Sequence, residues 1–376
     1  MAPEPAVRLV RLSVAGFRNL AEQDLAPHPR FTFISGANGQ GKTNLVEAVH
    51  YVLTLRMLRP GKLRELVAHG GSGAAIQAQL DLGGIEARRG VRLEVQGRSV
   101  VRALRREQTA ASVDEYLVAG AVVAFTPDDL GLVRGGPERR RRMLDRAIFN
   151  RWPAYLGEAR TYQRLLKSRN QLLRQRGAAS VRESFEPQLW ESGARILLRR
   201  QELLAELSPL IEDAFERIGL GHGRVRLRYA GLQKIDAGAS QSELAAALQE
   251  EAEARLSTDQ ERGFTSVGPH ADDVDFTLAG RAARSFASQG QARALVLAVK
   301  VAEIENLRAR IGHAPVLLLD DVSSELDPAR NASLLGYLKD LPSQVLLTTT
   351  DDGPLRGAVG PDSARWAVSQ GRVNIE

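Results

Sequence analysis

Cysteine is missing altogether from this chain of 376 residues. Without it, the protein has no disulfide framework, no thiolate metal site and no cysteine nucleophile. Arginine carries most of the positive charge, because lysine is nearly missing as well. Lysine occupies only positions 42, 62, 167, 234, 300 and 339.

Long apolar runs are missing too. No stretch of the sequence approaches the roughly 20 residues that a membrane-spanning helix needs. Residues 1–5 lack the basic-then-apolar layout of a secretory signal. We therefore expect a cytoplasmic protein without a membrane partner.

The remaining composition is that of a soluble globular protein, with 43% hydrophobic and 26% charged residues. The length allows two or three domains, each with its own core. A net charge of +6 makes polyanions, including nucleic acids, the expected class of partner.

A phosphate-binding loop is the clearest motif in the chain. Residues 31–34 predict a short strand, and the residues after it fit the pattern G-x-x-x-x-G-K-[ST]. Glycines let successive N–H groups approach a polyphosphate, and the helix that begins near Lys42 adds its positive dipole end. We expect Lys42 to face solvent without nucleotide and to reach the β- and γ-phosphates of ATP, with Thr43 as a ligand of Mg²⁺. The expected ATP-binding residues are Gly36, Ala37, Asn38, Gly39, Gln40, Gly41, Lys42, Thr43 and Asn44.

The rest of the chain predicts an α/β protein with a helical insertion. Val10, Leu12 and Val14 alternate with polar residues and predict an edge-like strand, and alternating runs within 76–103 predict antiparallel hairpins. From about residue 137 the chain becomes arginine-rich and helical in period. We expect an N-terminal half of an ATPase head at 1–138, an inserted, mainly helical domain at 139–262, and the C-terminal half of the head at 263–376.

Two aspartates follow the most apolar predicted strand, 315–319. A carboxylate at the carboxyl end of a parallel strand lies where such sheets bind their ligands. We expect Asp320 to hold Mg²⁺, and Asp321 to orient or deprotonate the attacking water. Lys42, Asp320 and Asp321 are therefore the predicted catalytic residues.

A second candidate anion site stands at 288–291, ahead of a predicted helix. Small residues at a helix N-terminus can cradle a phosphate. One ATP needs only one such loop within a subunit. The second cradle therefore makes sense in trans, closed over the γ-phosphate that another copy binds.

These elements, in this order, resemble the ABC-type ATPases, and specifically the RecF family of recombination-repair proteins, which is related to the SMC heads. The resemblance covers almost the whole chain. It implies an ABC-type P-loop ATPase head with a mixed sheet and an antiparallel β subdomain. It rests on residues 17–20, 36–43, 125–130, 139–145, 268–273, 288–291, 320–321, 323–327 and 348–351.

The resemblance also implies roles for single residues. Arg18 would lie near the nucleotide, and Ser324 and Asp327 would belong to the loop that crosses the dimer seam. The signature that meets the partner's ATP would consist of Ser288, Gln289, Gly290 and Gln291.

Three departures from the transporter ATPases imply slow hydrolysis. Threonines at 348–350 stand where transporters carry a switch histidine, and Asp321 replaces their usual glutamate. Residues 125–127 stand where many relatives place a metal-contacting glutamine.

Two polar clusters leave alternatives open. His270, Asp272 and Asp273 are either a metal site or, as we favour, a structural turn. The run Arg139, Arg140, Arg141 and Arg142 is either a solvated helix face or a DNA-contacting surface. Further arginines at 146, 151, 160, 164, 169, 174 and 176 make phosphate contacts credible.

The leading hypothesis is an ATP-controlled DNA clamp. Two subunits would sandwich two ATP molecules, close a basic surface on DNA, and separate after hydrolysis. The resemblance implies a weak, DNA-stimulated ATPase that acts as a switch at single-strand gaps and duplex junctions. It also implies loading of recombinase with RecR and RecO, in DNA repair, replication and the SOS response.

Two alternatives belong to other classes. The first is an ABC transporter ATPase subunit, which the arginine-rich insertion and the missing switch histidine disfavour. The second is an SMC-like structural ATPase, but an insertion of about 125 residues is too short for long heptad-bearing arms.

Overall fold

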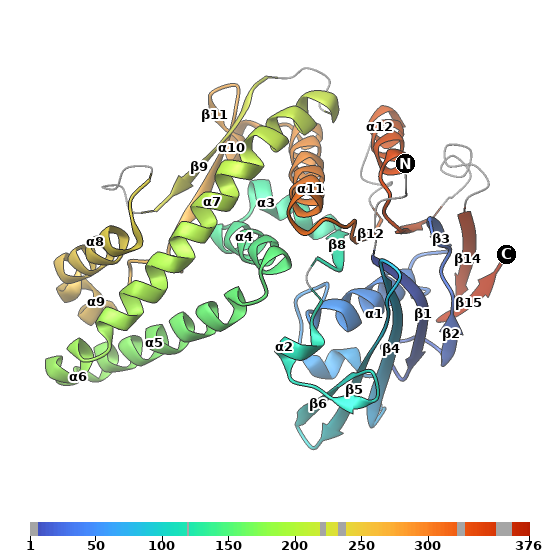
Figure 1. Ribbon diagram of the computed structural model, residues 1–376, viewed down its shortest axis with the longest axis horizontal. Helices are drawn as coiled ribbons and strands as arrows, with labels where there is room; N and C mark the ends of the chain where they lie inside the picture. The colour runs from blue at the N-terminus through green and yellow to red at the C-terminus, as the bar shows by residue number, and fades with distance from the viewer. Residues whose placement is uncertain (1–6, 119, 219–222, 232–237, 322–327, 351–362) are drawn as a thin grey trace.

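The computed structural model describes residues 7–118, 120–218, 223–231, 238–321, 328–350 and 363–376 (Figure 1). A head that contains two six-stranded sheets lies beside a helical lobe, with the long helix α7 running diagonally across the lobe. The expected fold class is confirmed: a mixed sheet, an antiparallel β subdomain and a mainly helical part make up the molecule.

The core sheet of the head has six strands. Five of these strands are parallel, and they come from both halves of the chain. Their carboxyl ends therefore lie at the same edge of the sheet. The sixth strand pairs antiparallel at the margin. The order is β15 (Arg372–Ile375), β14 (Ser363–Ser369), β3 (Phe31–Ser35), β13 (Val345–Thr349), β12 (Val316–Leu319) and β8 (Val122–Phe125).

The second sheet is antiparallel throughout and contains the expected hairpins. The strand predicted to be edge-like lies inside this sheet, because β1 pairs with both β2 and β4. Its alternation reflects burial of one face rather than an edge position. The order is β2 (Gln23–Leu25), β1 (Val7–Ala15), β4 (Gly73–Leu82), β5 (Glu86–Gln96), β6 (Ser99–Arg106) and β7 (Thr109–Ala110).

Both faces of the core sheet are covered, which explains why β12 reads as an unbroken apolar run. Leu317 and Leu319 pack into a cluster with the helices of the lobe, while Val316 and Leu318 pack with helix α1 and the antiparallel sheet. All four side chains are fully buried. Helix α1 (Lys42–Thr54) therefore lies between the two sheets, with its N-terminus at the edge where the parallel strands end.

The helical lobe is formed by α4 to α9, and it packs on the C-terminal third of the chain. Helix α11 (Gln289–Ile311) lies against α7, and β9 (Val225–Ala230) pairs with β10 (Asp273–Leu278) across the expected boundary at 262. The division at 138 and 262 stays a prediction. The lobe helices are α4 (Pro137–Arg151), α5 (Tyr155–Gln175), α6 (Ala179–Glu183), α7 (Glu186–Ile218), α8 (Gln241–Ala254) and α9 (Leu256–Arg262).

None of the helices in the described part of the chain is both long and apolar enough to span a membrane. Short elements join the parts described above. The remaining elements are η1 (Leu63–Leu66), α2 (Val113–Tyr116), η2 (Pro127–Leu130), α3 (Gly131–Arg134), α10 (Ala283–Phe286), β11 (Arg281–Ala282) and α12 (Pro328–Asp340).

Candidate nucleotide site

The phosphate loop joins β3 to α1 as the sequence predicts. Gly36 has a φ of 148°, and a Cβ there would lie 2.4 Å from the carbonyl oxygen of Val368. Gly41 has a φ of 116° and is the N-cap of α1. Both positions therefore require glycine because of backbone conformation, and Gly36 also because β14 passes close by.

Lys42 is buried rather than solvent-facing, which corrects the expectation. Its ammonium group donates to the carbonyl oxygens of Gly36 at 2.6 Å and Ala37 at 3.0 Å. Only 7% of the residue is exposed. Burial lowers the pKa of Lys42, while the nearby charges of Asp321 and Asp320 act to raise it. The lysine thus occupies the hollow of its own loop, with both acidic residues close to it.

Thr43 and Asp320 meet, although 277 residues separate them in the chain. The Thr43 hydroxyl donates to Oδ1 of Asp320 at 2.9 Å. Burial raises the pKa of the Asp320 carboxyl, and hydrogen bonds from Thr43 and Thr348 act in the opposite direction. A hydroxyl and a carboxylate side by side are hard oxygen donors, so this pair fits Mg²⁺.

Thr348 completes the group, and we did not predict a role for it. It is the penultimate residue of β13, which lies between the phosphate-loop strand β3 and the aspartate strand β12. Its hydroxyl donates to Oδ1 of Asp320 at 3.0 Å and accepts from the backbone N–H of Asp321 at 2.8 Å. The signal was its place at the expected switch position, where a hydroxyl can both donate and accept.

Asp321 turns out of the strand by adopting a left-handed backbone conformation, with a φ of 53°. This conformation is uncommon for residues other than glycine, but aspartate tolerates it better than most. The turn breaks the alternation that would otherwise place Asp320 and Asp321 on opposite faces. Both acidic side chains consequently act on Lys42.

Arg18 lies against α1 and binds the buried carboxylate of Glu47, with Nε and Oε2 2.9 Å apart. Arg59 contacts the same Glu47 oxygen at 3.1 Å and donates to Oδ1 of Asn44 at 2.6 Å. The positive charge of Arg59 acts against the rise that burial causes in the pKa of Asp320. Glu47 is fully buried one turn after Thr43, so it fixes two arginines beside the start of α1. Glu47 and Arg59 have no motif signal of their own.

Backbone and amide contacts hold the loop from its other side. Nδ2 of Asn44 donates to Oδ1 of Asn19 at 2.7 Å. The N–H of Gln370 donates to the side-chain oxygen of Gln40, and the N–H of Gly371 to its carbonyl oxygen. The turn between β14 and β15 therefore positions the loop, which no local sequence pattern indicates.

The signature segment begins α11 as expected. Ser288 is the N-cap: its hydroxyl accepts from the Gln291 N–H at 3.1 Å, and its own N–H donates to Oε1 of Gln291 at 2.9 Å. The N–H groups of Gln289 and Gly290 follow in the first turn, where a helix offers no internal acceptor. Ser288 and Gln289 are exposed. Ser324 and Asp327 lie outside the described residues.

The arginine run 139–142 is not a uniform solvated face. Arg140 is buried, is 3% exposed and binds Asp273 at 2.6 Å, so the structure corrects its expected DNA contact. Arg139 and Arg141 donate to the backbone carbonyls of Asp128 and Asp272. Arg142 alone among these four is exposed, paired with Glu138 one turn earlier at 3.0 Å. Burial of Arg140 satisfies the Asp273 carboxylate, which is a structural role.

The polar side chains at 270–273 form hydrogen bonds with residues of other elements, which favours the structural turn over the metal site. The Nδ1 of His270 lies 2.6 Å from the Tyr162 hydroxyl, and its Nε2 lies 2.8 Å from the carbonyl oxygen of Thr265. The Tyr229 hydroxyl donates to Asp272 at 2.9 Å. The described residues contain no group of three or more His, Asp or Glu side chains arranged to hold a metal ion.

A buried ionic cluster connects the head with α11. Lys300 is fully buried and donates to the carbonyl oxygen of Ala124, at the end of β8, at 2.8 Å. Its ammonium also lies 3.3 Å from Asp129 and 3.7 Å from Glu303. Arg146 of α4 binds Glu303 at 3.5 Å. A scarce lysine inside an apolar helix was a sequence signal for this cluster.

Comparison with known proteins agrees with this geometry. The model of the RecF/RecN/SMC N terminal domain matches residues 8–365. The "DNA replication and repair protein RecF" of Anaeromyxobacter dehalogenans (strain 2CP-C) is 49% identical over 369 residues, which cover 98% of this chain and 99% of the relative. The protein of the same name from Myxococcus xanthus (strain DK1622) is also 49% identical, over 373 residues, 98% of this chain and 97% of that one.

Solved structures show the same likeness. The recombination mediator protein RecF-ATPrS of the RecFOR pathway superimposes with a TM-score of 0.89 over 100% of both chains, at 28% identity. The corresponding RecF-ATP structure gives 0.90 over 100% of this chain and 99% of that one, at 26% identity. An Smc head bound to the C-winged helix domain of ScpA gives 0.55 at 16% identity over 99% of this chain and 97% of that one, which shows a shared fold alone.

Proposed function

This chain belongs to the RecF family, within the wider group of RecF, RecN and SMC heads, and from that premise we propose that it is an ATP-controlled clamp on DNA. The observation that carries the proposal is the hydrogen bond between Thr43 and Asp320. It brings the phosphate loop and the aspartate strand, from distant parts of the chain, into direct contact, which supports a single site built from both.

ATP binding is assigned to the phosphate loop and the first turn of α1. Loop N–H groups and the helix dipole attract the polyphosphate, and Lys42 exchanges the carbonyls of Gly36 and Ala37 for phosphate oxygens. Thr43 and Asp320 would hold Mg²⁺, which when bound neutralises charge on the phosphates.

Hydrolysis is assigned to the residues at the ends of β12 and β13. Asp321 would orient or deprotonate the attacking water, and Thr348 keeps the backbone of Asp321 in place through its hydroxyl. Threonine cannot serve as a proton carrier near neutral pH as histidine can, which supports slow turnover suited to a switch.

Dimerisation is assigned to the exposed start of α11. The capping box uses the N–H groups of Ser288 and Gln291, and the N–H groups of Gln289 and Gly290 remain for an anion. In the proposed dimer this turn binds the γ-phosphate held by the partner copy. Loss of that phosphate after hydrolysis would open the clamp.

DNA, RecR with RecO, and recombinase are the proposed partners. The curated relatives are named for DNA replication and repair, and the ATP-bound structural relatives are described within the RecFOR pathway. We propose that the closed dimer acts at single-strand gaps and duplex junctions, where it helps to load recombinase and where DNA stimulates its weak ATPase activity.

A mixing experiment tests the composite site. Ser288→Arg places a bulky cation in the signature turn, and Lys42→Met removes the phosphate-binding lysine. We expect each variant alone to lack ATPase activity and ATP-induced dimerisation, with the Ser288→Arg subunit still binding ATP. The mixture retains one intact site, with the loop from one subunit and the signature from the other.

The mixture should therefore recover a fraction of the wild-type ATPase activity. Circular dichroism of both variants controls for folding, because Lys42 is buried and its loss removes two hydrogen bonds. An absence of recovery at every mixing ratio, with both variants folded, would refute the sandwich dimer.

A further inference from the structure

Helix α5 carries a row of basic side chains that the nucleotide site does not use. Arg160, Arg164, Lys167 and Arg174 fall within a sector of about 80° when successive residues are placed 100° apart. Their positions span about 21 Å of helix. We call these four residues the basic stripe.

The other side of α5 is the packed side. Tyr162, Leu165, Leu166 and Leu173 are buried there. Arg169 also faces inward, is 1% exposed, and binds the carboxylates of Glu186 at 2.7 Å and Asp259 at 3.0 Å. The helix therefore separates a structural arginine from the arginines of the stripe.

The stripe lacks the compensating acids found on other helices. Arg142 and Arg217 each bind an acidic residue one turn away on their own helix, and Arg255, the C-cap of α8, binds Glu251 of that helix. On α5 the single acidic residue, Glu158, lies on the other side of the helix from the stripe. A row of like charges without acidic partners on its own helix costs stability, so its presence indicates an external partner of opposite charge.

Two members of the basic stripe can bind an external anion without breaking an existing ion pair. Arg164 and Lys167 are exposed, and neither forms an ion pair with any residue in the described part of the chain. Arg160 makes only a solvent-exposed contact with Asp114 at 3.7 Å. Arg174 donates through Nε to the carbonyl oxygen of Gly263 at 3.1 Å, which leaves its terminal nitrogens for another acceptor.

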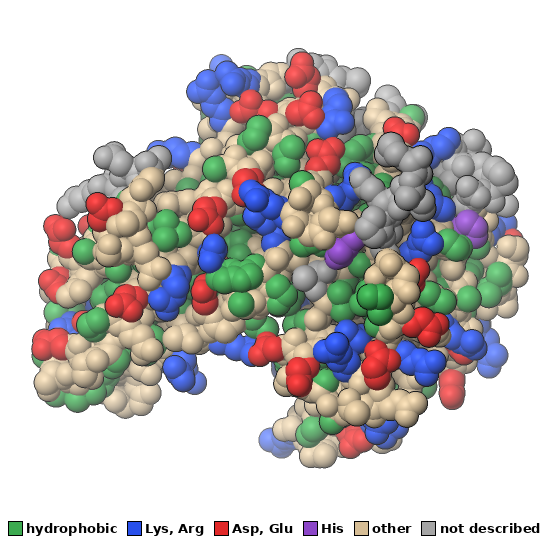
Figure 2. Space-filling view, in the orientation of Figure 1, with side chains coloured by type: hydrophobic (Ala, Val, Ile, Leu, Met, Phe, Trp, Pro, Cys, Tyr) green, Lys and Arg blue, Asp and Glu red, His purple; other side chains and the backbone are tan. Residues whose placement is uncertain are grey.

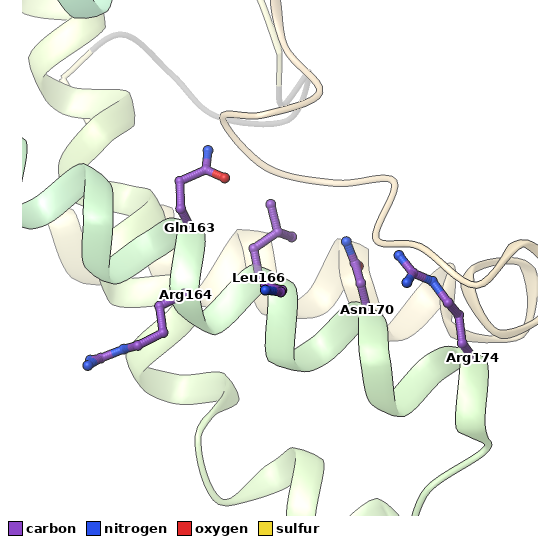
Figure 3. A pocket seen from close by; sticks show the side chains of 6 residues that line it. Gln163, Arg164, Leu166, Asn170 and Arg174 are labelled. Carbon is purple, nitrogen blue, oxygen red and sulfur yellow. The ribbon is translucent and has the colours of Figure 1, made fainter. Parts of the chain in front are cut away.

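A shallow hollow of about 510 Å³ runs along the stripe. Its lining includes the amides of Gln163 and Asn170 as well as Arg164, Lys167 and Arg174. Figure 3 shows Arg164 and Gln163 projecting from opposite edges of α5 in this view, so donors stand at both edges of its exposed face. Figure 2 shows the molecule hollowed at its lower edge, between the lobe and the antiparallel sheet, with basic side chains on the lower edge of the lobe.

We propose that the basic stripe contacts the phosphate backbone of duplex DNA in the clamp. This inference rests on the proposed function and assigns it a DNA surface away from Arg139–142. The 21 Å length matches about six nucleotides of one strand at 3.4 Å each. Guanidinium, ammonium and amide donors suit phosphate oxygens, while a protein partner would call for aromatic or apolar anchors that the stripe does not offer.

The test measures how DNA affinity depends on salt. Arg164→Gln/Lys167→Gln removes two cations without adding acidic charge. Each lost phosphate contact reduces the slope of log K against log salt by about 0.9 for duplex DNA. We expect the double variant to lower the slope by about 1.8, measured by fluorescence anisotropy of a labelled duplex with ATP present.

A matched double variant, Arg226→Gln/Arg228→Gln, removes the same charge from exposed positions on β9 and should leave the slope unchanged. ATP-induced dimerisation of both double variants, followed by light scattering, should match the wild type. An unchanged slope in Arg164→Gln/Lys167→Gln, or an equal loss of slope in both double variants, would contradict the DNA contact proposed for the basic stripe. Wild-type protein that binds no duplex at low salt would instead refute the proposed function, and the stripe with it.

Discussion

At the scale of single residues, Thr348 links the two aspartates of the candidate nucleotide site. Its hydroxyl donates to Asp320 and accepts from the backbone of Asp321. One oxygen atom thus fixes the candidate metal ligand and the candidate water-orienting residue relative to each other. Removing it frees both.

We predict that Thr348→Val slows turnover and leaves ATP binding intact. Valine keeps the shape of the side chain but loses both hydrogen bonds, each with a net worth of about 1 kcal/mol. That loss corresponds to a decrease in kcat of about tenfold or more. Steady-state kinetics and equilibrium ATP binding measure the two effects separately.

Thr32→Val is the matched control, because Thr32 is a buried threonine on β3 whose hydroxyl accepts only from the His28 N–H among the described contacts. It should lower stability without changing kcat. A Thr348→Val variant with wild-type kcat would contradict the positioning role.

At the scale of elements, α1 is an unusual helix because it buries polar side chains between two sheets. Glu47 and His50 are both buried, and they lie on the turns that follow the phosphate loop. Burial lowers the pKa of His50 to about 4, helped by the charge of Arg146. The His50 ring therefore stays neutral in the folded protein at neutral pH, with Nδ1 3.0 Å from the Arg56 carbonyl oxygen.

This pKa predicts a loss of stability on acidification. Above the unfolded-state pKa of about 6.5 the histidine is neutral in both states, and below it the unfolded chain takes up a proton that the folded chain refuses. The contribution of His50 to the free energy of unfolding should fall by about 2 kcal/mol between pH 7.5 and pH 5. Urea unfolding at both pH values measures it.

His50→Gln removes the titrating group and serves as the reference for other ionisable residues. The difference in unfolding free energy between wild type and variant should shrink by that amount as the pH falls. A difference that stays constant across the range would show that His50 does not titrate as proposed.

The sequence predicted the helices and strands whose position follows from local burial alone. A local sequence pattern marks each of them: the strand β3 after Arg30, the loop with α1, and the apolar run of β12. The order of strands does not, so the place of β13 between β3 and β12, and with it the role of Thr348, could not be read from the sequence. Arg140 was misassigned for the same reason, because its partner Asp273 lies 133 residues away.

At the scale of the whole molecule, the buried cluster around Lys300 joins three parts of the chain. Lys300 and Glu303 belong to α11, Asp129 follows β8, and Arg146 comes from α4 of the lobe. Helix α11, which begins with the candidate signature turn, is thereby fixed to the sheet that carries the candidate nucleotide site. The cluster thus pairs two cations with two carboxylates.

We predict that Lys300→Met destabilises the protein strongly. Methionine fills similar volume but leaves two buried carboxylates with Arg146 alone, and breaking a buried pair costs about 3 to 5 kcal/mol. Urea unfolding measures the loss. Adding Asp129→Asn should recover part of it, because a neutral amide no longer needs the ammonium.

If the double variant is less stable than Lys300→Met by the full cost of Asp129→Asn in the wild type, the two residues do not interact. Additive costs would therefore contradict the cluster. A single cooperative transition in each protein is required for the comparison.

The position of β3 also bears on how the protein is made. Its two neighbours in the sheet are β13 and β14, which end at Thr349 and Ser369. On the ribosome, the phosphate-loop strand must wait for more than 300 further residues, about 15 to 60 s at ordinary translation rates, before either neighbour emerges. All six strands of the antiparallel sheet are complete at Ala110. A nascent chain would therefore acquire its scaffold early and its nucleotide site last, so that products of interrupted synthesis could not bind ATP.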